Sequence, residues 1–156
     1  MSPATLSLPA RTARLYGSAA QLVDRLQPLF ALAVRIYVAS VFFRSGLTKL
    51  HDWNITLTLF RNDYHVPVLP PVLAAVLGTG AELGLPVLLF FGLGSRFAAA
   101  ALFVFNIVAA TSYPDLSDAG RVYHMMWGAL LLVTFFYGPG KFSLDHLFGR
   151  RLFVSG

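Results

Sequence analysis

The sequence predicts an all-α integral membrane protein, a four-helix bundle with short amphipathic surface helices at both ends. Hydrophobic residues make up 56% of its 156 residues and charged residues only 12%, about half the charged fraction of a typical soluble domain. The mean hydropathy is +0.66. Four apolar segments, separated by Gly, Pro and charged residues, are long enough as helices to approach the ~30 Å hydrocarbon core of a bilayer.

The first 27 residues are expected to form a cytoplasmic tail and a surface helix. Residues 1–14 are polar or small and predict a disordered tail. Beyond them, apolar residues recur at helical spacing at Leu15, Ala19, Leu22 and Leu26. This pattern favours a short helix on the membrane surface over residues 15–27, with an unstructured leader as the alternative.

The first span is expected from Pro28 to Leu50, although it contains Arg35 and Arg44. On the insertion scale its apolar residues favour the membrane by roughly 3 to 6 kcal/mol. Two arginines at its centre would cost about 5 to 7 kcal/mol, and less at their off-centre positions. The balance is near zero, so neighbouring helices or partners for the arginines must help this span to insert.

The remaining spans are predicted over Val72–Leu93, Arg96–Tyr113 and Val122–Tyr137, so that the transmembrane domain covers residues 28–140. The loop from His51 to Pro71 contains the apolar run Ile55–Phe60, which suits a short re-entrant or surface helix. Gly138-Pro139-Gly140 ends the last span. In the cytoplasmic segment 141–156, Ser143 is a plausible N-cap of another surface helix, with Asp145 in its first turn.

Charge predicts the orientation. Four spans place both termini on one side of the membrane. The termini and the middle turn carry the basic residues Arg11, Arg14, Arg25, Arg96, Lys141, Arg150 and Arg151. The opposite loops carry Lys49, Arg61 and Arg121, diluted by Asp52, Asp63, Asp115 and Asp118. The positive-inside rule then places both termini in the cytoplasm. The net charge of +5 indicates basic residues facing anionic lipid, and no nucleic-acid partner is expected.

Glu82 is the only charge in the apolar run from Val66 to Gly94. A carboxylate near the middle of a membrane helix is costly and marks either a functional or a paired structural site. Gly80 and Gly84 form a small-xxx-small pair beside it, which predicts the close approach of another helix.

On an ideal helix Arg35, Gly46 and Lys49 share one face, whereas Arg44 points the opposite way. If the ends near Leu50 and Val72 lie at one depth, Glu82 falls between Arg44 and Arg35, and the shared face favours Arg35 as its partner. The functional interpretation is a stripe of Arg35 and Lys49 facing Glu82, which binds an anionic or quinone-like ligand or relays protons. The structural alternative is that Arg35 and Glu82 only neutralise each other and fix helix packing.

Three histidines, His51, His65 and His124, fall on the outer side in this topology. They are weak candidates for a metal site, because their spacing matches no ligand motif, and no metal is predicted. His124 could bond to a quinone carbonyl or act as an interface anchor. Asn106, the polar residue inside the third span, is expected to bond to another helix.

Several of these residues together resemble the DoxX family of small four-span membrane proteins. The matching features are Arg35, then Phe43, Gly46 and Lys49, and later Glu82 followed by Gly84, Leu89 and Gly92. The segment Tyr137-Gly-Pro-Gly-Lys-Phe-Ser-Leu-Asp145 is similar to the closing motif of the family. The resemblance extends over roughly residues 28–148 and implies a multi-pass protein of the bacterial cytoplasmic (inner) membrane. It also implies a role in a redox or stress-related membrane system, with quinone as a candidate cofactor.

Three functions stay open at this point. The first is an oxidoreductase-associated membrane subunit with protein partners in a membrane complex. The second is a non-enzymatic scaffold that anchors soluble partners, and the third a small-molecule permease. The chain has no cysteine, which excludes thiol redox chemistry and cysteine-held iron–sulfur clusters. The lipid bilayer is a partner in every case, and a homo-oligomer is compatible with all three.

Overall fold

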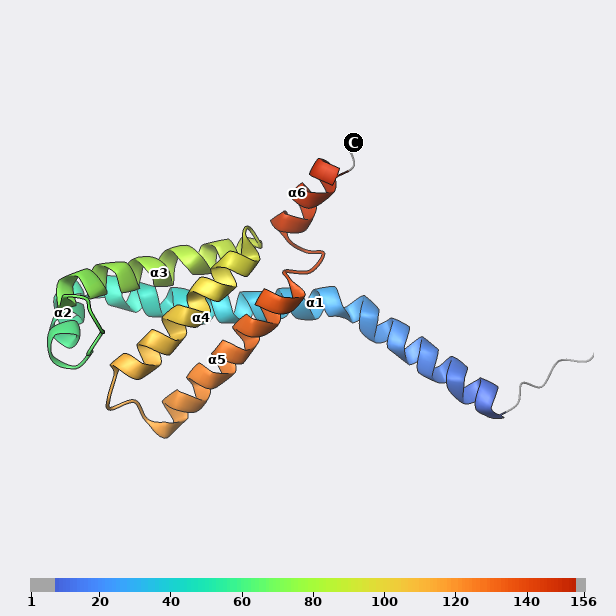
Figure 1. Ribbon diagram of the computed structural model, residues 1–156, viewed down its shortest axis with the longest axis horizontal. Coiled ribbons are helices and arrows are strands. Elements are labelled where there is room, and N and C mark those ends of the chain that lie inside the picture. Colours follow the sequence, from blue (N-terminus) through green and yellow to red (C-terminus); the bar gives the residue numbers. More distant parts are fainter. Residues whose placement is uncertain (1–7, 154–156) are drawn as a thin grey trace, which may run out of the picture.

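The computed structural model describes the backbone of residues 8–153 and the side chains of residues 12–149. Within this part the chain forms only helices, so the all-α prediction is confirmed. The helices are α1 (Leu8–His51), α2 (Trp53–Asn62), α3 (Pro71–Phe91), α4 (Ser95–Ser112), α5 (Asp118–Tyr137) and α6 (Leu144–Phe153). α1 packs along α3, α4 packs along both α3 and α5, and α5 also contacts α1 (Figure 1).

Helix α1 is one continuous helix of 44 residues. The prediction of a disordered tail over residues 1–14 is therefore wrong from Leu8 onward, and residues 1–7 lie outside the described part. The prediction of a separate surface helix over 15–27 is also wrong, because Pro28 lies inside α1 without ending it. A proline inside a helix removes a hydrogen bond and bends the axis, and the N-terminal part of α1 leaves the bundle at an angle (Figure 1).

Three of the described helices, α1, α3 and α4, are long and apolar enough to cross a membrane. The predicted fourth span is not confirmed. Helix α5 has 20 residues, a suitable length, but its first half carries Asp118, Arg121 and His124. These polar side chains lower its hydropathy, although Leu131 in its second half is fully buried.

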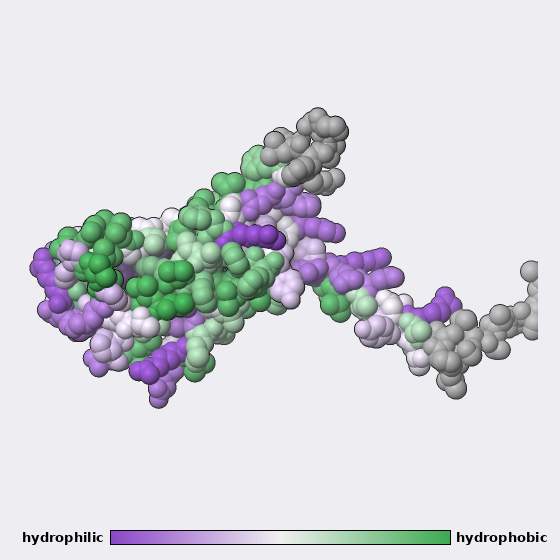
Figure 2. Space-filling model, viewed as in Figure 1, coloured by the Kyte–Doolittle hydropathy of each residue, from purple (hydrophilic) through white to green (hydrophobic). Residues whose placement is uncertain are grey.

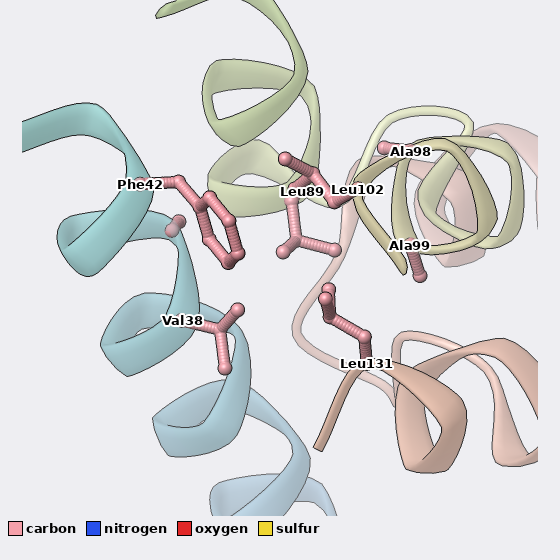
Figure 3. Close-up of a cluster of buried hydrophobic side chains, with 8 residues drawn as sticks. Val38, Phe42, Leu89, Ala98, Ala99, Leu102 and Leu131 are labelled. Atoms are coloured by element: carbon pink, nitrogen blue, oxygen red, sulfur yellow. The ribbon is translucent and has the colours of Figure 1, made fainter. Parts of the chain in front are cut away.

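The main hydrophobic core lies where α1, α3, α4 and α5 meet (Figure 3). Its large members are Val38 and Phe42 of α1, Leu89 of α3, Leu102 of α4 and Leu131 of α5. The small side chains of Ala98 and Ala99 let α4 lie close to these residues. The ring of Phe42 meets those of Phe105 and Trp127 edge to face, an arrangement that aromatic pairs favour.

Helices α1 and α3 pack closely at Gly46. A β-carbon at this position would lie 2.9 Å from Leu83 Cδ2 and 3.1 Å from Glu82 Cβ. The predicted role of Gly80 and Gly84 is wrong, because no atom of the described residues would lie within 4 Å of a β-carbon at either position. The glycine that permits close packing here is therefore on α1, and Gly80 and Gly84 lie on the exposed face of α3.

Helix α2 covers the first turns of α3. Asp52 caps it by accepting a hydrogen bond from the Ile55 amide at 2.9 Å. Phe60 is buried with Ala74 and Ala75 in a second, smaller cluster. The short helix expected over 55–60 therefore exists and extends over Trp53–Asn62. It packs on the turns of α3 that lie beyond the end of α1.

Candidate functional site

Glu82 forms an ion pair with Lys49. The Lys49 Nζ atom lies 2.6 Å from Glu82 Oε2 and 2.8 Å from Oε1. The hydroxyl of Ser45, one turn earlier on α1, donates to Oε1 at 3.0 Å, and the ammonium donates to Ser45 Oγ at 3.1 Å. The exposed side-chain fractions are 5% for Glu82 and 18% for Lys49. The pair is therefore shielded, with the acid deeper than the amine.

This geometry corrects the predicted partner of Glu82. Arg35 lies in the interior of α1, at the other end of the bundle, where its guanidinium donates to the carbonyls of Leu89, Phe90 and Phe142. Arg44 is exposed, on the opposite face, as predicted. The predicted face is confirmed, because Arg35, Gly46 and Lys49 all point toward α3, but Lys49 rather than Arg35 reaches the acid.

The reason is an offset between the two helices. Gly46 lies level with Glu82, as their contact shows. Counted from that level at ~1.5 Å per residue, α1 ends at His51 after about 7 Å and α3 begins at Pro71 after about 16 Å. Helix α3 therefore projects roughly 9 Å beyond α1, with α2 packed on the projecting turns. The assumption of level helix ends placed Glu82 too deep relative to α1.

Arg35 holds the closing segment of the chain against the bundle. It is 1% exposed, and its three carbonyl acceptors belong to the end of α3 and to Phe142. A buried cation bonded only to neutral carbonyls needs a negative charge nearby, and Asp145 is the acid next to it in this part of the chain. Arg35 therefore has a packing role at the end of α3, but the predicted structural alternative is wrong, because Arg35 does not neutralise Glu82.

Asp145 caps helix α4 as well as lying in the first turn of α6. Its carboxylate accepts hydrogen bonds from the amides of Gly94 and Ser95 at 2.7 and 2.8 Å. Its own amide donates to the carbonyl of Gly92 at 2.8 Å. Ser143 caps α6 as predicted, accepting from the His146 amide at 3.2 Å. The sequence could not indicate the role of Asp145 in α4, because 50 residues separate the acid from the amides that it caps.

A cavity of about 340 Å³ opens beside the ion pair. It lies between α1, α3, α4 and the segment that follows α2, and Lys49, Glu82 and Ser45 form part of its wall. Aromatic and aliphatic side chains make up most of the remainder, among them Phe60, Phe105, Leu77, Val108 and Leu116. Further polar groups come from Tyr64, Ser112, Tyr113 and His124.

Ser112 supplies an unused polar atom in this wall. The residue is 1% exposed, and its Oγ atom bonds to no group in the described part of the chain. A buried hydroxyl without a partner costs about 1 to 3 kcal/mol. Arg35 Nε, Thr79 Oγ1 and Ser95 Oγ are also without a partner in the described part of the chain, but of these four residues Ser112 is the one that lines the cavity. Nothing in the sequence singled out Ser112, because a serine at a helix end ordinarily reads as a turn residue.

Tyr64 and Tyr113 were also missed. Their ring centroids lie 5.3 Å apart, and the ring of Phe60 lies against that of Tyr64 in a tilted arrangement, with the centroids 4.8 Å apart. Burial raises the pKa of the Tyr64 phenol, and the charges of Glu82 and Asp63 and the Tyr113 phenol raise it further. Tyr64 therefore stays a neutral hydroxyl group over the physiological pH range. In the sequence, an aromatic residue in a loop between membrane spans indicates only a headgroup anchor.

Asn106 holds the imidazole of His124. Its amide nitrogen donates to the backbone carbonyl of His124 at 2.8 Å, and its amide oxygen lies 2.8 Å from the His124 Nδ1 atom. Since an amide oxygen only accepts, Nδ1 must carry the proton in this arrangement, which leaves Nε2 as the free ring nitrogen. The predicted bond from Asn106 to another helix is confirmed, and its partner is the predicted site residue on α5.

The outer histidines do not gather around a metal position. His51 and His65 are exposed, and the described residues hold no group of three His, Cys, Asp or Glu side chains that could bind a metal ion. Of the predicted site residues, Lys49, Glu82 and His124 line one cavity, Asn106 lies behind His124, and Arg35 lies at the far end of the bundle.

The fold and the site define a class: a small helical membrane protein with a buried ion pair and a mostly apolar cavity. Comparison with known proteins places the chain within it. The sequence profile of the DoxX family matches residues 30–114. An uncharacterized protein of Haemophilus influenzae is 32% identical over 122 residues, which cover 74% of this chain and 81% of the relative. The chain belongs to the DoxX family. No solved structure matches it.

Proposed function

We propose that this protein is a membrane subunit of a redox or stress-related system, and that its cavity binds a small planar ligand of the quinone class. The carrying observation is the unpartnered, buried hydroxyl of Ser112 in a mostly apolar cavity beside the Lys49–Glu82 pair. Ligand sites are typically concave and apolar with a few convergent polar groups, and the volume lies at the small end of their usual range.

The residues present fit such a ligand. A quinone ring is flat and apolar with carbonyl oxygens at opposite edges. The rings of Phe60, Tyr64 and Phe105 supply apolar walls. The hydroxyl groups of Ser112, Tyr64 and Tyr113 are donors of the kind that a carbonyl oxygen accepts. A bound quinone would supply electron and proton transfer, and this chain's own groups would bind and orient the ring.

The Lys49–Glu82 pair would set the electrostatic character of the cavity. The two charges neutralise each other, so an uncharged ligand meets no net charge. Ser45 bonds to both partners and thereby holds the pair against the α1–α3 interface. An anionic ligand would compete with Glu82 for the ammonium and is therefore disfavoured relative to a neutral one.

The proposed topology has α5 as a fourth span and both termini in the cytoplasm of a bacterial cell. In Figure 1 the N-terminal part of α1, the α3–α4 turn and α6 lie toward one end of the bundle, and α2 and the α4–α5 loop lie toward the other. Reporter fusions at Gly156 and after Asp118 test the arrangement. Periplasmic activity at Gly156 would contradict it.

Binding can be tested with the purified full chain in lipid nanodiscs and a short-chain benzoquinone as the probe. Ser112→Ala removes the donor and should weaken binding roughly fivefold, the effect of one ordinary hydrogen bond. Thr111→Ala is the matched control, because this exposed hydroxyl bonds to its own helix. Equal affinities for wild type and Ser112→Ala, or equal losses in both variants, would contradict the proposal.

A second candidate function is a scaffold that anchors soluble proteins. The N-terminal part of α1 favours the scaffold function, because this part of the helix extends beyond the bundle. The exposed fractions of its apolar side chains Leu15, Tyr16 and Val23 are 71%, 79% and 66%. Replacing these three side chains by Gln should release a co-purifying soluble partner without changing the folded yield. Unchanged co-purification would contradict the scaffold.

A further inference from the structure

A second recess lies at the end of the bundle that holds the α3–α4 turn and α6, away from the Lys49–Glu82 cavity. It has a volume of about 550 Å³ and is formed by the start of α4, the end of α5 and the segment from Gly138 to His146. Arg96, Lys141 and His146 line it. In Figure 2 hydrophilic side chains gather at the end from which α6 departs, directly beside hydrophobic surface.

Arg96 and Lys141 are the two permanently charged basic residues of this recess. Among the described side chains, neither Arg96 nor Lys141 forms a hydrogen bond or an ion pair, and both are exposed. Asp145 is the one acid in the lining, and both of its oxygens already accept from the amides of Gly94 and Ser95. The recess therefore holds two cations against one carboxylate and has a net positive charge, although Asp24 lines a neighbouring pocket together with Lys141.

The backbone around the recess holds its shape. Gly138 and Gly140 have φ values of 82° and 78°, the left-handed region that favours glycine. A β-carbon at Gly138 would lie 3.6 Å from Arg96 Nη2, so the glycine leaves room beside the guanidinium. The bonds of Asp145 tie the other wall to α4. The cations are thus presented by a fixed turn and not by a loose tail.

The surroundings point to a lipid. Phe97 and Tyr137 line the recess and are 67% and 78% exposed, as aromatic side chains are at the level where hydrocarbon meets headgroups. Guanidinium groups bind phosphate oxygens in a fork, and an ammonium adds a point charge. Basic pockets between membrane helices bind anionic headgroups.

We propose that Arg96 and Lys141 bind the phosphate of an anionic phospholipid in this recess, on the side of the membrane that holds α6. The phosphate would contact the guanidinium beside Gly138 and the ammonium of Lys141, and the acyl chains would lie along the exposed apolar side chains next to Phe97. This site is independent of the cavity at Lys49 and Glu82.

The test uses the full chain in nanodiscs, with retained lipids counted by native mass spectrometry. The probes are phosphatidylglycerol and phosphatidylcholine, with inorganic phosphate as a soluble competitor. Arg96→Gln with Lys141→Gln should lower the preference for phosphatidylglycerol roughly 25-fold, a factor of about five for each basic side chain. Arg96→Lys keeps the charge without the fork and should give an intermediate value.

The matched control is Arg61→Gln with Arg121→Gln, which removes the same charge at the opposite end of the bundle. This control should keep the preference, and thermal unfolding in phosphatidylcholine should show that both double variants are folded. Equal losses in the two double variants, or no preference in the wild type, would overturn the proposal. Displacement of phosphatidylglycerol by millimolar inorganic phosphate would assign the site to a soluble phosphate compound and overturn the lipid assignment.

Discussion

The Lys49–Glu82 pair gives the sharpest test of the structure. Lys49→Met removes the ammonium and leaves the carboxylate, which is 5% exposed, with the Ser45 hydroxyl as its remaining side-chain donor. Glu82→Gln removes the opposite charge but keeps an oxygen that Ser45 and Lys49 can still reach. The two substitutions should therefore differ in cost, although they break the same ion pair.

Breaking a buried pair costs about 3 to 5 kcal/mol, because one charge stays without compensation. Lys49→Met should lie in this range. Glu82→Gln should cost less, roughly 1 to 3 kcal/mol, because Lys49 is 18% exposed and its flexible chain can move its charge toward water. The double variant leaves neither charge, so its cost should be smaller than the sum of the two single costs by at least about 1 kcal/mol.

Unfolding by sodium dodecyl sulfate in mixed micelles, followed by far-ultraviolet circular dichroism, measures these differences as a double-mutant cycle. Arg44→Gln is the control, because it removes a charge from the exposed face of α1 and should change stability by no more than about 0.5 kcal/mol. Additive losses in the double variant would refute the pair. A loss in Arg44→Gln as large as in Lys49→Met would show that the assay reports net charge and not pairing.

Substitutions at three further places test other contacts by the same unfolding assay. Gly46→Val should cost about 1 to 3 kcal/mol of stability by separating α1 from α3. Gly80→Val, on the exposed face, should cost less than about 1 kcal/mol, which is what β-branching in a helix costs. Equal costs would contradict the packing at Gly46. Gly138→Val forces a β-branched residue into a positive φ and should cost about 1 to 3 kcal/mol. Pro139→Ala should cost less than about 1 kcal/mol. The reverse order of costs would argue against the turn. Asp145→Ala removes the cap of α4, worth about 1 kcal/mol, and also the acid beside buried Arg35, so its total cost should exceed that of a cap alone. It should speed amide exchange at the start of α4, and unchanged exchange would contradict the cap.

The sequence predicted only some of the polar groups that lie together in the folded protein. Asn106 was expected to bond to another helix because an amide in lipid needs a partner, and that reasoning needs no coordinates. Its partner, His124, was itself predicted as a site residue, either as a group that bonds to a quinone carbonyl or as an interface anchor. The joint arrangement fixes a tautomer, and it depends on the rotation of α4 against α5. Ser112, Tyr64 and Tyr113 form part of one cavity only because α2 and the segment after it fold back over α3.

The sequence by itself determined the helical class, the membrane environment and the face of α1 that meets α3, because hydropathy and the helical repeat act locally along the chain. It also predicted that Glu82 lies in the bundle interior within reach of a basic side chain of α1. Only the tertiary structure decided the partner. The choice between Lys49 and Arg35 depends on a sliding offset of roughly 9 Å between two helices, set by the packing of α2 on the first turns of α3 and by the close contact at Gly46. The sequence of either helix does not reveal such an offset, because the same apolar faces of α1 and α3 would pack together at several relative positions along their axes.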